Sequence, residues 1–62
     1  MTISNEDRVR ILEEAGTLLK RAASDLYVAA QFVEDDRTDD SELMLDAAML
    51  KSDEANKKLA DL

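Results

Sequence analysis

Leucine and alanine recur at heptad spacing through the first half of the chain, and this pattern constrains the fold more than any other feature. A leucine or valine stands at every seventh position from Leu12 to Val33, and an alanine follows each leucine three residues later. Apolar residues at alternating spacings of three and four over three heptads predict a helix that packs against other helices. The leucine row is Leu12, Leu19, Leu26 and Val33, and the alanine row is Ala15, Ala22 and Ala29.

A third row, made of small residues, lies beside the alanines: Gly16, Ala23 and Ala30. Small side chains allow the backbone of another helix to approach closely. Glycine destabilises a helix interior by about 1 kcal/mol relative to alanine, so its presence needs a reason. We interpret Gly16 first as a close helix crossing and second as a hinge.

The sequence predicts an all-α fold, an antiparallel two-helix hairpin in a single domain spanning residues 1–62. The chain has no proline and one glycine, which excludes a fold with many turns. Helices are predicted at about 5–34 and 40–60, with an acidic turn between them. Ser4 is the expected N-cap of the first helix and Asp39 that of the second, with Glu42 at the third helical position.

The second helix carries its own heptad row, in which large and small residues mix, so large residues of one helix are expected to face small residues of the other. This row consists of Leu45, Ala48, Ser52, Ala55, Leu59 and Leu62. The residues predicted to form the core of the hairpin or of its dimer are Leu12, Ala15, Leu19, Ala22, Leu26, Ala29, Val33, Leu45, Ala48, Ala55 and Leu59.

A chain of 62 residues needs more than one helix–helix seam to fold stably. Cysteine and histidine are absent, so neither a disulfide nor an ordinary zinc site supplies the missing stability. Association of copies is the remaining route. We therefore predict a homodimeric four-helix bundle.

The same composition argues against catalysis. The serines have no histidine to activate them, and a helical hairpin offers no pocket that tunes paired carboxylates. The acidic turn does not follow the EF-hand calcium pattern, because Arg37 stands at a ligand position and Asp40 replaces the required glycine. The sequence predicts a protein that is not an enzyme and uses no cofactor or metal.

The net charge is −7, and residues 34–46 carry −6 of it. Such a surface disfavours direct binding to nucleic acid or to an anionic membrane, and it is compatible with a basic protein partner. The acidic cluster also fits imitation of DNA phosphates, although capping and solubility explain it more simply. With no signal peptide and no apolar run longer than 26–30, a cytoplasmic location is expected.

The apolar surface near the turn exceeds what one hairpin seam requires. We interpret the surplus first as more of the dimer core and second as a partner-binding surface with aromatic anchors. The residues of this candidate partner-binding surface are Tyr27, Val28, Phe32, Leu43, Ala47 and Leu50.

With its capped long helix, short acidic turn and leucine–alanine layers in both helices, the chain resembles the Rop family of plasmid RNA-binding hairpins. That resemblance implies an antiparallel, dimeric four-helix bundle. In its small size, acidity, lack of catalytic residues and surplus apolar end, the chain also looks like helical hairpins with which phages inhibit host proteins, including an anti-activator of quorum sensing.

The leading hypothesis is a small regulatory protein that dimerises and inhibits another protein, with transcription regulators as the candidate class of partner. The alternatives are a Rop-like nucleic-acid-binding regulator, an acidic DNA-mimic antagonist and a structural assembly subunit.

Overall fold

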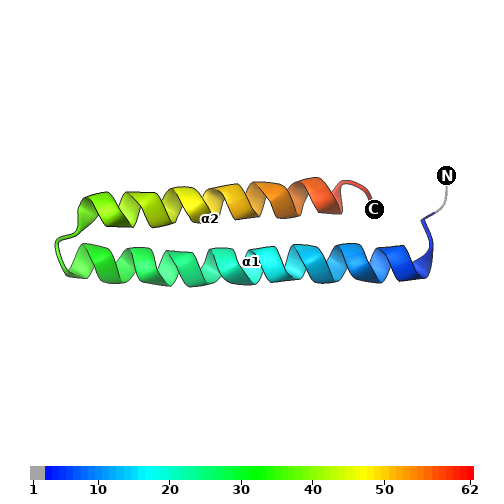
Figure 1. Cartoon of the computed structure of the whole chain (residues 1–62), viewed down its shortest axis with the longest axis horizontal. Helices are drawn as coiled ribbons and strands as arrows, with labels where there is room; N and C mark the ends of the chain where they lie inside the picture. The colour runs from blue at the N-terminus through cyan, green and yellow to red at the C-terminus, as the bar shows by residue number, and fades with distance from the viewer. Residues whose placement is uncertain (1–2) are drawn as a thin grey trace.

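The computed structural model describes residues 3–62 and shows two antiparallel helices joined by a short turn (Figure 1). Helix α1 spans Asn5–Glu34 and helix α2 spans Thr38–Leu59. The longer α1 extends past the end of α2, and the start of α1 and the end of α2 lie opposite the turn (Figure 1). The predicted helical hairpin is therefore confirmed.

Helix α1 has the bounds that the sequence predicted. Ser4 takes an extended conformation, and its Oγ accepts a hydrogen bond of 3.1 Å from the backbone N–H of Asp7. This bond satisfies one of the donors that the first turn of a helix leaves free. Ser4 is confirmed as the N-cap.

The turn consists of residues 35–37, and its geometry is that of a Schellman motif. The N–H of Arg37 donates to the carbonyl of Phe32 at 2.7 Å, and the N–H of Asp36 donates to that of Val33 at 3.1 Å. Asp36 has φ 59°, the left-handed conformation that this motif requires after a helix. An aspartate thus occupies a position that usually holds glycine.

Helix α2 begins two residues before its predicted start, so the assignment of Asp39 as its N-cap is wrong. The N-cap is Arg37, and its side chain makes no capping hydrogen bond. Asp39 and Asp40 instead lie in the first helical turn, where carboxylates interact favourably with the helix dipole. The Nε of Arg37 also donates to Asp40 at 2.7 Å, and Glu42 is accordingly the fifth helical residue.

The seam between the helices is lined by alanine. The buried residues in the described part of the chain are Ala15, Ala22, Ala29, Ala48 and Ala55, each exposed by 8% or less. These five alanines are among the residues predicted for the core, but the expected layers of large residues against small ones are not what the hairpin has. Leu12, Leu19, Leu26, Val33 and Leu45 lie beside the seam and are 43–56% exposed, whereas Leu59 is half-buried.

Gly16 is not a close crossing within the hairpin. A Cβ atom added to it would meet nothing within 4 Å, and the residue is exposed. The two helices thus give no reason for glycine at this position. Neither helix is both long enough and apolar enough to cross a membrane, over the residues that the structure describes.

Candidate protein-interaction surfaces

The alanine seam divides the hairpin into two long faces. Residues at offsets of +1, +4 and −3 from a seam alanine turn to one side of the helix. Residues at offsets of −1, +3 and −4 turn to the other side. In an antiparallel pair, the same offsets on both helices lie on the same side of the molecule. Two grooves, one on each side of the seam, confirm this division.

The first side, which we call the leucine face, is apolar or uncharged along its whole length. At its centre, Leu19, Ala23, Leu26, Met49 and Ser52 line a groove of about 320 Å³ together with two seam alanines. The complete leucine face consists of Leu12, Gly16, Leu19, Ala23, Leu26, Ala30 and Val33 on α1 and of Leu45, Met49, Ser52, Asn56 and Leu59 on α2.

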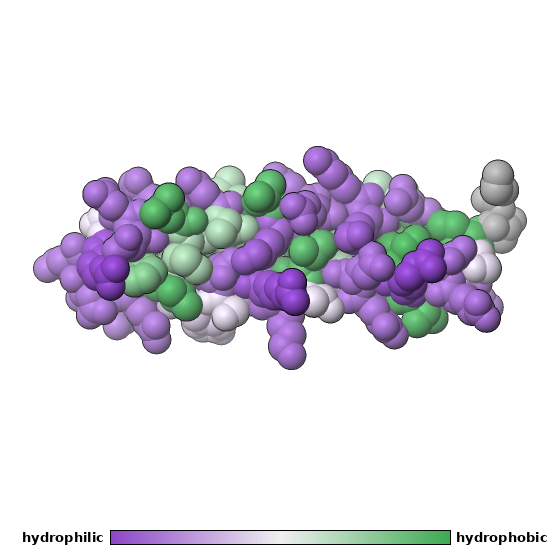
Figure 2. Space-filling view, in the orientation of Figure 1, coloured by the Kyte–Doolittle hydropathy of each residue, from purple (hydrophilic) through white to green (hydrophobic). Residues whose placement is uncertain are grey.

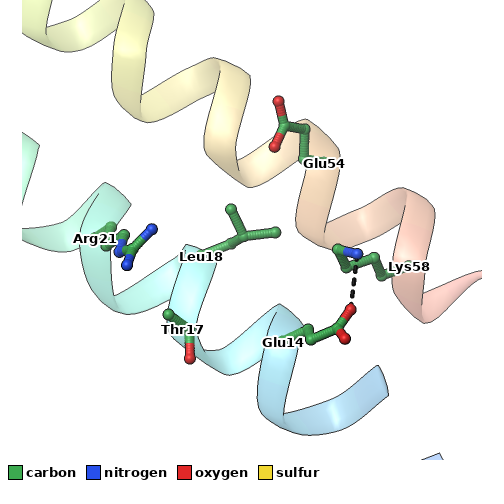
Figure 3. A pocket seen from close by; sticks show the side chains of 6 residues that line it. All are labelled: Glu14, Thr17, Leu18, Arg21, Glu54 and Lys58. Carbon is green, nitrogen blue, oxygen red and sulfur yellow. Dashed lines mark hydrogen bonds and ion pairs between the residues drawn. The ribbon is translucent and has the colours of Figure 1, made fainter. Parts of the chain in front are cut away.

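The second side, which we call the ion-paired face, carries bridges between the helices. The ammonium of Lys51 pairs with the carboxylate of Asp25, whose side chain is only 14% exposed. Nearer the chain ends, the Nζ of Lys58 donates to Glu14 at 2.9 Å (Figure 3). These bridges connect α1 and α2 at two levels along the hairpin.

The Glu14–Lys58 pair lies at a shallow groove into which Leu18 projects from α1 toward α2 (Figure 3). The hydrogen bond from Lys58, together with its charge, lowers the pKa of Glu14, and Glu14 in turn raises the pKa of Lys58. A depressed acid pKa adds stability that is lost as pH falls through it, and a raised lysine pKa adds stability that is lost as pH rises through it. The pair therefore supports the hairpin between mildly acidic and alkaline pH.

The hairpin covers its apolar side chains unequally on the two faces. On the ion-paired face, Ile11, Leu18, Phe32 and Met44 are half-buried. On the leucine face, the corresponding large residues of α1 are at least 43% exposed. On the face that Figure 2 shows, hydrophilic groups interrupt the hydrophobic ones along the whole length of the molecule.

The six residues predicted as a partner-binding surface fall into two groups. Val28, Phe32 and Ala47 are half-buried and belong to the ion-paired face by their offsets from the seam. The other three point away from the seam on the outer sides of the two helices, with large exposed fractions. These are Tyr27 at 77%, Leu43 at 67% and Leu50 at 61%.

The acidic turn is held together by its single arginine. Arg37 pairs with Asp40, and its guanidinium carbon lies 4.6 Å above the ring centre of Phe32. A shallow depression is lined by Asp36, Asp39, Asp40 and two neighbours. In the described residues, acidic side chains do not converge into a group able to hold a metal ion.

Sequence reasoning placed Ser52 in the seam row of α2, and it did not single out Met49 and Asn56 as members of one surface with the leucine row. The available signal was the absence of charge at positions one and four after each seam alanine of α2. The Asp25–Lys51 bridge had no such signal, because pairing across helices depends on the displacement that the turn imposes.

Comparison with protein-family models, curated proteins and solved structures finds no match to this chain. The resemblance to the Rop family therefore rests on the hairpin architecture, and that to phage inhibitors rests on size, acidity, the lack of catalytic residues and the surplus apolar end.

Proposed function

We propose that this chain is a small acidic regulatory protein that works as a homodimeric four-helix bundle and inhibits another protein by binding to it. The observation that carries the proposal is the amount of apolar surface that the hairpin leaves exposed. Exposed apolar patches mark sites of protein interaction. With no histidine or cysteine in the chain, binding explains such a surface better than catalysis does.

The total surface supports a dimer. The accessible surface of the chain is 4885 Å², whereas a globular monomer of 6.9 kDa exposes about 4,000 Å². The excess of roughly 900 Å² is close to the ~800 Å² per partner that a stable interface of standard size buries. The excess is therefore large enough to accommodate an interface of standard size with one further copy of the chain.

The outward residues Tyr27, Leu43 and Leu50 support a second, heterologous contact. They point away from the seam on both helices, so a dimer formed through one long face leaves room for a partner on another. Tyrosine is enriched among residues that dominate binding energy. The net charge of −7 favours a partner with a basic surface, and transcription regulators are one such class.

Capture of a partner from cell lysate by the immobilised protein tests this function. Recovery of one protein at fixed stoichiometry is the expected result, whereas recovery that requires RNA would favour the Rop-like alternative. Self-association with no captured partner would favour a structural subunit.

With the partner in hand, Tyr27→Ala should cost about 2 kcal/mol or more of binding free energy, measured by calorimetry. Gln31→Ala is the matched control, because Gln31 is exposed one turn further along α1, and it should bind normally. Changing Asp35, Asp36, Asp39 and Asp40 to asparagine should mainly slow association. If that variant loses binding even at low salt while Tyr27→Ala binds normally, the DNA-mimic function replaces this one.

A further inference from the structure

The leucine face is one of two apolar areas that the hairpin leaves uncovered, the other being the outward residues Tyr27, Leu43 and Leu50. Leu19, Leu26 and Met49 are 43%, 49% and 58% exposed around one groove, while the large apolar residues of the ion-paired face are half-buried. A row of large apolar side chains running along both helices needs a covering element of similar length. In the proposed homodimer, the helices of a second copy are long enough to be this covering element.

The absence of charge from this face indicates what covers it. The chain carries −7, and two copies repel each other wherever their carboxylates approach. None of the residues that define the leucine face is ionisable, and the polar ones are Ser52 and Asn56. Two equally acidic chains can therefore meet there without burying a carboxylate, which would be costly.

We infer that the leucine face binds the leucine face of a second copy, with α1 of each copy lying on α2 of the other. This inference rests on the proposed dimer and assigns its interface. Ala23 and Met49 line the same groove and so lie at the same level along the hairpin. A two-fold axis parallel to the helices places Ala23 opposite Met49 of the second copy, which pairs a small residue with a large one. An axis across the helices at this level would instead pair Ala23 with Ala23 and Met49 with Met49 of the second copy.

The first test compares Met49→Glu with Leu50→Glu in sedimentation equilibrium. The two residues are neighbours in α2, are 58% and 61% exposed, and give variants of equal charge, but only Met49 lies on the leucine face. Met49→Glu should weaken the dimer by about 100-fold or more because it buries a carboxylate at the interface. Leu50→Glu should leave the dissociation constant within about threefold, since exposed substitutions have small effects.

The second test leaves the apolar character of the face largely unchanged and asks which helices meet. The chain has no cysteine, so single cysteines introduced by Ala23→Cys and Met49→Cys report only on each other. After the two variants are mixed and oxidised, a disulfide-linked heterodimer should form. Ala23→Cys alone should remain uncrosslinked, because the two Ala23 positions are separated when α1 lies on α2 of the other copy.

The outcomes separate this inference from the function on which it rests. If the wild-type protein is monomeric, the proposed dimer itself is wrong. If Met49→Glu and Leu50→Glu weaken the dimer equally, the proposed dimer remains valid. Its interface would then not be the leucine face. Crosslinking of Ala23→Cys to itself, or failure of the mixed pair to crosslink while the dimer persists, would overturn the arrangement of helices.

Discussion

At the scale of single residues, Asp36 is the position where local conformation and residue type disagree. Its φ of 59° lies in the left-handed region, which costs an ordinary residue roughly 1 kcal/mol but costs glycine little. The hydrogen bonds of Asp36 and Arg37 to the end of α1 keep it there. The strain is the local cost of closing a three-residue turn.

We predict that Asp36→Gly raises the free energy of unfolding by about 0.5–1 kcal/mol, whereas Asp36→Val lowers it by 1 kcal/mol or more. Both changes remove the same charge, so their difference isolates the backbone conformation. Urea denaturation followed by circular dichroism measures the effect. Equal stability of the two variants would show that residue 36 is not held in the left-handed conformation.

At the scale of the helices, we expect the bridge between Asp25 and Lys51 to contribute more to the free energy of unfolding than the bridge between Glu14 and Lys58. Asp25 is 14% exposed at its side chain, whereas Glu14 is 47% exposed. A carboxylate that loses its partner is more costly the less water reaches it. Both bridges join α1 to α2, but the loss of each should have a different effect on stability.

A double-mutant cycle tests this difference. Lys51→Met should lower the free energy of unfolding by about 1–2 kcal/mol because it leaves the mostly buried carboxylate of Asp25 without its partner. Adding Asp25→Asn should restore much of that loss. In the matched pair, Lys58→Met should have a clearly smaller effect, and high salt should abolish it. Equal losses for both lysine variants would contradict the ranking by exposure.

The sequence predicts the helices better than it predicts how they meet. Ser4 and the heptads define both ends of α1, because a capping side chain and an apolar period are local signals. The predicted start of α2 is two residues late, because aspartates favour turns but also stabilise the first turn of a helix.

Local sequence signals do not determine which of two neighbouring rows of α1 faces α2. Periodicity identified both the leucine and the alanine rows, which lie side by side on α1, and either could have faced α2. The burial of Ala22 and the exposure of Leu19 follow from the closeness and displacement of the helices. The partner-binding residues Tyr27, Leu43 and Leu50 stay a prediction.

At the scale of the whole molecule, charge and apolar surface act against each other. Two copies with −7 each would repel, while the proposed contact between their uncovered leucine faces would attract. Salt weakens only the first of these. An interface without ion pairs should therefore respond to salt in the opposite sense from an interface held by them.

We predict that the dimer tightens as sodium chloride rises from about 10 mM to about 1 M, which shortens the Debye length from ~30 Å to ~3 Å. The thermal midpoint should also rise with protein concentration, as linkage to association requires. The variant with asparagine at Asp35, Asp36, Asp39 and Asp40 is the control, and its salt response should be smaller. Weaker association at high salt would indicate that ion pairs hold the interface.

The alanine seam reverses the usual relation between side-chain size and tolerance to substitution. In most cores the large residues are constrained, but here the buried positions are alanines such as Ala55 and Ala15, exposed by 0% and 2%, where added volume is destabilising. The leucines beside them need only be apolar. In a library of variants selected for folding, the smallest side chains should vary least, and the leucine row should exchange freely among leucine, isoleucine and methionine.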